Sequence, residues 1–313
     1  MRTMRGRFAP SPTGEIHLGN AWTALLAWLQ VRAAGGTMVL RVEDLDPDRS
    51  RPEYGEQLMV DMKWLGLDWD EGPDVGGCYA PYCQAERRGL YQAALERLAA
   101  AGLVYSCYCT RAELVASAPH GSENERVYTG ICRRRKLDDA RQVIRHPALR
   151  LAVPPGETSF SDLHAGFRSQ DISREIGDFI VRRSDGIHAY QLAVVVDDAA
   201  MNITHVLRGD DLLSSTPRQL LLYRLLGLKA PVFTHVPLLI DQEGHRLSKR
   251  QQALSIAALR ERGVKAESII GYLAWKAGLL ERCQQVKASE LIAGFAIDKL
   301  PSGQLIVEYP LPV

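Results

Sequence analysis

The first hundred residues alternate between strand-like and helix-like patterns, and this alternation constrains the fold more than any other feature of the chain. Residues 7–11 are strand-like and run into a Pro-rich turn, residues 18–34 carry apolar side chains at helical spacing, and residues 38–42 are strand-like again. Strands that alternate with helices are typical of βαβ units over a parallel sheet. We therefore expect an α/β fold that binds its ligands beyond the carboxyl ends of the strands.

The middle of the chain has a different character, with clustered cysteines, a basic run at 133–136 and only short strand-like stretches. We expect an inserted α+β subdomain there. The alternation then returns, with expected strands at 190–196 and 204–208, and the chain after Ala253 is expected to be helical. The predicted division is two halves of one core at 1–101 and 186–253, the insertion at 102–185, and a C-terminal helical subdomain at 254–313.

Composition narrows the class of protein only a little. No apolar run approaches the roughly 20 residues that cross a bilayer, and the N-terminus lacks the apolar stretch of a signal peptide. We expect a cytoplasmic monomer with no membrane association. The formal net charge of +1 decides nothing about nucleic acid, because a neutral average can hide a basic face.

Three of the six cysteines, Cys107, Cys109 and Cys132, lie within a short stretch. In a reducing compartment such a cluster indicates metal ligands rather than a disulfide framework. A structural zinc ion normally takes four ligands, so a fourth must come from elsewhere. His120 and His146 are within reach along the sequence.

Two distant segments have residues suited to phosphate groups. His17 stands at the expected start of a helix with Gly19 just inside it, and a helix N-terminus favours an anion, to which His17 can donate a hydrogen bond. Far downstream, Ser248 and Lys249 follow an apolar strand-like stretch, and they can stabilise charge on a pyrophosphate leaving group. Either feature alone is common, as a capped helix or a solvated charged loop.

Taken together, these segments, HLGN at 17–20 and RLSKR at 246–250, resemble the two signature motifs of class I aminoacyl-tRNA synthetases. Further segments are similar to the glutamyl-tRNA synthetase branch, namely 8–14, 41–46, 65–72, 194–198, 203–211 and 216–219. The resemblance extends over roughly residues 5–280. It implies a Rossmann-like class I synthetase core that uses ATP, with Mg²⁺, to activate L-glutamate.

The resemblance also implies roles for individual residues. A dianionic amino acid needs guanidinium groups for its carboxylates and an acid for its ammonium group, and Glu43 is expected to take the ammonium. Arg208 is expected to reject the neutral amide of glutamine. The implied glutamate-binding residues are Arg7, Ser11, Glu43, Tyr190 and Arg208; the implied ATP-binding residues are Pro10, Gly19, Asn20, Asp211 and Lys249; the implied catalytic residues are His17, Ser248 and Lys249.

The nature of the RNA acceptor follows from a further resemblance. Full-length glutamyl-tRNA synthetases continue into a large anticodon-binding domain, which we do not expect here because the sequence ends at Val313, soon after the second motif. A shortened group of glutamyl enzymes has this form and attaches glutamate to the queuosine base in the anticodon loop of tRNA(Asp). In that group a tyrosine completes a zinc site, which implies one structural zinc held by Cys107, Cys109, Tyr128 and Cys132.

Two alternatives to tRNA(Asp) modification remain open. Residues 72–77 and 247–250 look as much like full-length glutamyl enzymes, which favours a stand-alone enzyme that charges tRNA(Glu) at its 3′ end. The other alternative is a non-catalytic RNA-binding protein derived from a synthetase. The presence of His17, Glu43, Arg208, Ser248 and Lys249 argues against it, since an abandoned site is expected to lose such residues.

Overall fold

Parallel strands form the centre of the molecule in the computed structural model, which describes residues 3–110, 113–114, 127–128, 130–134, 146–245, 247 and 254–308. Strand β1 (Arg5–Phe8) pairs in parallel with β2 (Thr37–Leu40), and β8 (His205–Gly209) pairs in parallel with β9 (Val232–Val236). The Thr204 backbone N–H donates to the Arg5 carbonyl at 2.9 Å, so the two strand pairs lie side by side. The expected α/β class is confirmed.

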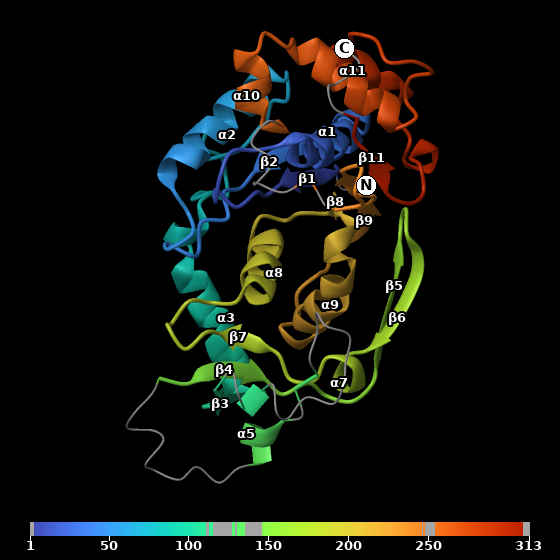
Figure 1. Cartoon of the computed structure of the whole chain (residues 1–313). Coiled ribbons are helices and arrows are strands. Elements are labelled where there is room, and N and C mark those ends of the chain that lie inside the picture. Colours follow the sequence, from blue (N-terminus) through green and yellow to red (C-terminus); the bar gives the residue numbers. More distant parts are fainter. Residues whose placement is uncertain are drawn as a thin grey trace.

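A first hydrophobic core surrounds helix α1 (Leu18–Ala33), which is apolar on nearly all sides and buried along most of its length, as expected of a helix inside a protein. Helices α2 (Pro52–Trp64), α10 (Ile256–Glu261) and α11 (Ala266–Lys276) pack around it (Figure 1). The remaining elements of this part are η4 (Ala288–Gly294), η5 (Ile297–Lys299), and the parallel pair β10 (Leu239–Ile240) and β11 (Leu305–Ile306).

The chain after residue 254 was expected to be helical, and most of its described elements are helices. It also contains β11, however, which pairs with β10 from the preceding part of the chain. Residues on α10, α11 and η4 are buried in the same core as α1. The last described segment is therefore packed against the parallel strands by shared apolar contacts.

A second hydrophobic core lies below the parallel strands in Figure 1 and contains helices α3 (Arg88–Ala100), α8 (Tyr190–Ala200) and α9 (Thr216–Leu225). The expected strand at 190–196 was wrong, because this segment is the first part of α8. A short apolar run rich in valine does not distinguish a buried strand from a buried helix. The next residues, Asp197 and Asp198, continue the same helix and place two buried carboxylates under the strands.

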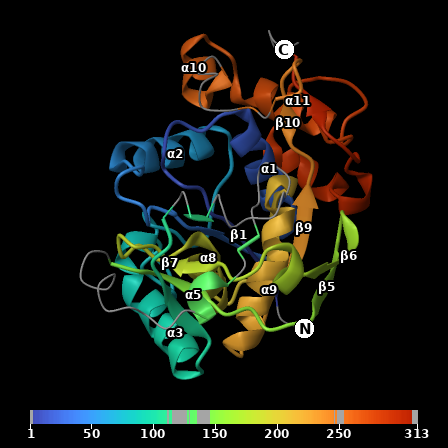
Figure 2. The same cartoon turned by 60° about the horizontal axis from the view of Figure 1, so that its bottom comes forward.

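Residues 102–185, which the sequence predicts to be an insertion, contain antiparallel strands, in contrast to the parallel centre. Strands β3 (Val104–Cys107), β4 (Ala148–Leu151) and β7 (Ile180–Arg182) form a three-stranded sheet. Strands β5 (Glu157–Asp162) and β6 (Gly166–Asp171) form a hairpin that runs along one side of the molecule (Figures 1 and 2). At its tip the Leu163 backbone N–H donates to the Phe233 carbonyl of β9 at 3.0 Å.

Four short helical elements complete the description. They are η1 (Gln84–Glu86), α5 (Ile131–Arg134), α7 (Ile172–Glu175) and η2 (Asp210–Ser215), the last of which connects β8 to α9. No helix in the described ranges has the length and apolarity required to cross a membrane.

Candidate active site and cysteine cluster

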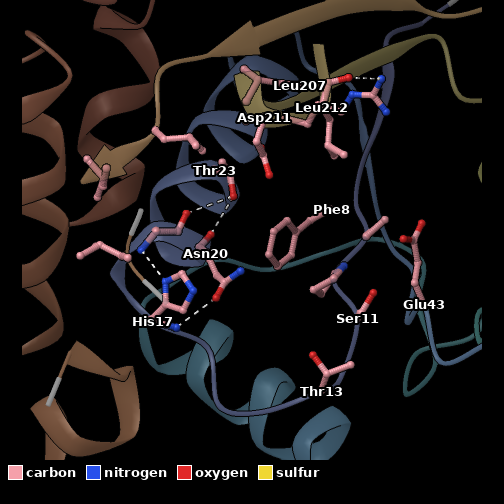
Figure 3. Close-up of a pocket in the computed structure, with 18 of the residues that line it drawn as sticks. Phe8, Ser11, Thr13, His17, Asn20, Thr23, Glu43, Leu207, Asp211 and Leu212 are labelled. Carbon is pink, nitrogen blue, oxygen red and sulfur yellow. Dashed lines mark hydrogen bonds between the residues drawn. The ribbon is translucent and has the colours of Figure 1, made fainter. Parts of the chain in front are cut away.

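A pocket of about 550 Å³ opens beyond the carboxyl ends of β1 and β8, at the start of α1 (Figure 3). The tertiary structure gathers around it nearly all the residues that the sequence nominated for ligand binding. These are Arg7, Ser11, Glu43, Tyr190 and Arg208 for glutamate, Pro10, Gly19, Asn20 and Asp211 for ATP, and His17 for catalysis. Ser248 and Lys249 lie outside the described residues, although Leu247, just before them, lines the same pocket.

The pocket has two polar ends. In Figure 3, Ser11 and Glu43 lie at one end, and His17, Asn20 and Thr23 at the other, with Phe8 between them. Asp211, at the start of η2, points into the space from a third side. This arrangement separates Ser11 and Glu43, nominated for glutamate, from His17 and Asn20, nominated for catalysis and the nucleotide.

His17 caps the N-terminus of α1 with its own side chain. Its Nδ1 accepts a hydrogen bond from the Gly19 backbone N–H at 3.0 Å, while the Asn20 side-chain oxygen accepts from the His17 backbone N–H at 3.1 Å. Because Nδ1 is an acceptor, a neutral His17 carries its proton on Nε2. His17 can therefore cap the helix and donate from Nε2 at the same time.

The spacing of the His-x-Gly motif has a local physical cause. A Cβ atom at Gly19 would lie 2.9 Å from His17 Cε1, so a larger residue would push the imidazole out of its capping position. The Gly19 N–H, one of the backbone donors at this helix N-terminus, is already bonded to His17. The side chain that this motif presents to the pocket is the imidazole of His17.

Arg208 is a buried cation with no carboxylate within 4.0 Å among the described residues. Its hydrogen bonds go to neutral acceptors: Nε donates to His235 at 2.9 Å, and Nη2 donates to Thr216 and to Gln219, each at 2.8 Å. Its Nη1 is buried and has no hydrogen-bond partner in the part of the chain that the structure describes. Burial accordingly lowers the pKa of Arg208, which is the signature of a positive charge that still needs an anion.

The other buried charges at this end of the pocket, those of Arg7, Arg41, Glu43 and Asp198, form ion pairs with one another. Asp198 Oδ1 accepts from Arg41 Nη1 at 2.7 Å and from Arg7 Nε at 3.3 Å, and Arg41 Nη2 donates to Glu43 Oε1 at 3.0 Å. Burial would raise the pKa of Asp198, but Arg7 and Arg41 outweigh it and hold that pKa below its usual value. Burial raises the pKa of Glu43 despite the opposing effect of the same arginines, so an additional cation would stabilise this carboxylate.

The cysteine cluster, which we define as Cys107, Cys109, Cys132 and Tyr128, lies at the end of β3 and the start of α5. The three Sγ atoms lie within 4.8 Å of one another. The Tyr128 hydroxyl lies 3.5 Å from Cys107 Sγ and 3.7 Å from Cys109 Sγ. Three thiols and a phenol oxygen therefore converge on one point, a donor set that fits a zinc ion.

The two histidines considered as a fourth ligand differ in position. His146 is exposed and does not belong to the group of clustered donor atoms. His120 lies outside the described residues. Tyr128 is 6% exposed, and the Arg150 guanidinium lies 3.8 Å from the centre of its ring, which fixes the phenol against the thiols.

Comparison with known proteins identifies the family of this chain. The sequence profile of the tRNA synthetases class I (E and Q), catalytic domain, matches residues 3–300. The chain belongs to this family. A crystal structure of a glutamate tRNA ligase from Elizabethkingia meningosepticum in complex with its amino acid is similar over 98% of this chain and 67% of that chain, with a TM-score of 0.84 at 29% identity.

Curated relatives of two kinds match this class I synthetase chain. A protein named glutamyl-Q tRNA(Asp) synthetase from Symbiobacterium thermophilum is 53% identical over 95% of this chain and 93% of its own length. Another protein with that name, from Nitratidesulfovibrio vulgaris, is 55% identical over 88% of this chain and 87% of its own length. A glutamate–tRNA ligase from Symbiobacterium thermophilum is 45% identical over 87% of this chain but only 57% of its own length.

Sequence reasoning missed the residues that hold this synthetase pocket in shape. Arg41 and Asp198 received no role, yet both are almost completely buried and link Arg7 to Glu43. Asp197 is also buried and accepts from Arg87 Nε at 2.6 Å. The available signal was the pair of adjacent acids inside an otherwise apolar helical run, since buried carboxylates require cationic partners.

Proposed function

We propose that this chain uses ATP to activate L-glutamate as glutamyl-adenylate and transfers the glutamyl group to the queuosine base in the anticodon loop of tRNA(Asp). Membership of the class I (E and Q) synthetase family supports the ATP-dependent chemistry. The observation that carries the choice of amino acid is Arg208, a buried guanidinium in the pocket whose Nη1 has no partner among the described residues. A carboxylate ligand supplies the anion that this group lacks.

Glutamate complements the pocket on charge as well. We assign its side-chain carboxylate to Arg208 and its ammonium group to Glu43, whose raised pKa would fall again beside a cation. Arg7, Ser11 and Tyr190 complete the proposed amino-acid site, with Arg7 shared between Asp198 and the ligand. Glutamine is excluded because its neutral amide leaves the guanidinium charge buried and unpaired.

Activation places the amino acid against ATP. An oxygen of the glutamate α-carboxylate attacks the α-phosphorus of ATP, the bond to the pyrophosphate oxygen breaks, and pyrophosphate leaves. We assign His17 the role of donating from Nε2 to a phosphate oxygen, with Pro10, Gly19, Asn20 and Asp211 around the nucleotide. Mg²⁺ accompanies ATP as part of the substrate. Ser248 and Lys249 keep their proposed role of stabilising charge on the pyrophosphate.

The RNA acceptor is supported by the relatives rather than by the pocket. Proteins named glutamyl-Q tRNA(Asp) synthetase are 53% and 55% identical to this chain, which spans 93% and 87% of their lengths. The glutamate–tRNA ligase of Symbiobacterium thermophilum is less similar, at 45% identity. Charging of tRNA(Glu) at its 3′ end is therefore the weaker candidate, and a non-catalytic role conflicts with the uncompensated Arg208.

For the cysteine cluster we propose one structural zinc ion held by Cys107, Cys109, Cys132 and Tyr128. The support is the convergence of three Sγ atoms within 4.8 Å and the buried phenol beside them. When bound, the ion would join β3 to α5 and lower the pKa of its thiol and phenol ligands. The antiparallel sheet β3–β4–β7 also supports the proposal that residues 102–185 are an insertion into the parallel core.

Two assays test this function. Exchange of labelled pyrophosphate into ATP should require glutamate, should proceed without RNA, and should not occur with glutamine. Labelled glutamate should then enter tRNA(Asp) that contains queuosine but not the same tRNA without it, and nuclease digestion should place the label on an anticodon nucleoside. Label on the 3′-terminal adenosine of tRNA(Glu) would replace the proposed acceptor, while failure of the exchange would overturn the activation step.

A further inference from the structure

A buried chain of hydrogen bonds connects Arg208 to the tip of the β5–β6 hairpin. Arg208 Nε donates to His235 Nε2 at 2.9 Å, and His235 Nδ1 lies 2.6 Å from Asp162 Oδ2. Asp162 and His235 are 5% and 1% exposed, and neither lines the pocket. Their influence on a ligand must therefore pass through Arg208.

The same contacts decide which nitrogen of His235 carries the proton. Asp162 Oδ1 also accepts from the backbone N–H groups of His235, His164 and Ala165, and together with the His235 ring these bonds outweigh burial and keep the pKa of Asp162 below its usual value. An ionised carboxylate only accepts, so His235 Nδ1 donates to it. Burial lowers the pKa of His235, and the neutral ring then presents the lone pair of Nε2 to Arg208.

Neutral acceptors hold the rest of the guanidinium. Nη2 donates to Thr216 Oγ1 and to Gln219 Oε1, each at 2.8 Å. Because the guanidinium is planar and rigid, bonds at Nε and Nη2 fix the direction of Nη1, which has no partner within the described ranges. A carboxylate in place of His235 would also fix Arg208, but it would neutralise the charge that a ligand has to meet.

We propose that Asp162 and His235 are positioning residues that orient the Arg208 guanidinium for a side-chain carboxylate while leaving its charge available. Asp162 fixes the His235 ring, and the ring in turn fixes Arg208. The neutral ring also keeps the Asp162 carboxylate away from the Arg208 guanidinium. This proposal rests on the proposed function, because it assigns amino-acid selection to Arg208. It also gives the hairpin, which belongs to the inserted segment, a part in the selectivity of the parallel core.

The substitution Asp162→Asn tests this with little change of shape. Three backbone N–H groups require an oxygen at Oδ1, so the new NH₂ group must occupy the position of Oδ2 and face His235 Nδ1. His235 then has to accept at Nδ1 and carry its proton on Nε2. The Nε2 proton then points at the N–H of Arg208 Nε. Because both groups are donors, the hydrogen bond between them is lost and the guanidinium loses its fixed orientation.

Glutamate-dependent pyrophosphate exchange gives the measurement. In Asp162→Asn we expect the KM for glutamate to rise roughly 10- to 100-fold, the range for loss of a hydrogen bond to a charged group. The KM for ATP should stay at the wild-type value, kcat should change less than the glutamate KM, and the preference for glutamate over glutamine should fall by at least about tenfold. Glu157→Gln, an acid-to-amide change at an exposed position of the same hairpin, should match wild type.

A second pair of variants keeps the proposal testable if Asp162→Asn does not fold. His235→Gln keeps a neutral donor and acceptor, whereas His235→Leu has neither, so the glutamine variant should retain glutamate selection better. The proposal is overturned if these two raise the glutamate KM equally, or if Asp162→Asn alters the KM for glutamate and for ATP alike. If the wild-type protein itself shows no glutamate-dependent exchange, the proposed function fails. If the wild-type protein is active and Asp162→Asn behaves like it, only the positioning proposal fails.

Discussion

The pocket and the cysteine cluster both bring together polar groups that suit a ligand, yet the chain assembles them in different ways. The pocket depends on residues far apart in sequence: Arg7, which lines it, is hydrogen-bonded to Asp198, 191 positions away. The cluster joins Cys107 to Cys132 through the end of one strand and one short helix. Loss of a pocket residue should therefore disturb charges across the core, whereas loss of a cluster ligand should act mainly on β3 and α5, where the cluster lies.

The largest effect is expected from Arg208→Ala, which removes the uncompensated guanidinium. We expect kcat/KM for glutamate in pyrophosphate exchange to fall roughly 10³-fold, as for truncation of one partner of a buried charge pair. Arg208→Lys keeps the charge but loses the rigid fork, so its loss should be smaller. Unchanged glutamate affinity in Arg208→Ala would refute the role assigned to Arg208. It would also contradict the expectation that loss of a pocket residue disturbs the core more widely than loss of a cluster ligand.

A smaller effect, confined to the rate, is expected at the nucleotide end of the pocket. His17→Ser can still cap α1 but lacks the imidazole, and Lys249→Ala removes a cation from the second motif. Each should lower kcat of exchange by about 100-fold, the cost of one group that stabilises charge in the transition state, with little change in the KM for glutamate.

The matched variant His17→Ala separates capping from catalysis. It should lose the same rate as His17→Ser and, in addition, about 1 kcal/mol of the free energy of unfolding, because the helix cap is lost. Thermal or denaturant unfolding measures the difference. Near wild-type exchange in Lys249→Ala would overturn the assignment of the second motif.

For the cysteine cluster we expect about one zinc ion per chain, measurable by elemental analysis of the purified protein. Tyr128→Phe should release zinc to a chelator more readily, by at least the roughly tenfold typical of losing a supporting group at a metal site. His146→Ala and His120→Ala are the controls and should retain the metal. Zinc loss from a histidine variant, with retention in Tyr128→Phe, would show that the fourth ligand is wrong.

The smallest effect concerns the influence of the cluster on the pocket. Removal of zinc by a chelator should leave glutamate-dependent exchange close to that of the untreated protein, because the cluster and the pocket share no residue among those described. Transfer of glutamate to tRNA(Asp) should fall more than exchange does. Equal losses of exchange and of transfer would mean that the cysteine cluster and the pocket are coupled, although they share no described residue.

Sequence patterns were sufficient where a feature is local. The helical spacing after residue 18 predicted α1, and the tight spacing of Cys107, Cys109 and Cys132 predicted that their thiols converge. The His-x-Gly motif is also local, because Gly19 is required by the imidazole two residues before it. The valine run at 190–196 was assigned wrongly, since strand and helix periodicity cannot be separated in so short an apolar stretch.

The sequence by itself determined the α/β alternation, the two signature motifs, and the polar residues nominated for glutamate and ATP. Only the tertiary structure decided which charges cancel. In the folded chain Asp198 accepts hydrogen bonds from Arg7 and Arg41, and Arg41 also donates to Glu43. Arg208 instead donates to His235, Thr216 and Gln219 and has no carboxylate nearby among the described residues. The reason is that a buried charge is balanced by its neighbours in space, and a sequence does not state which distant side chains those will be.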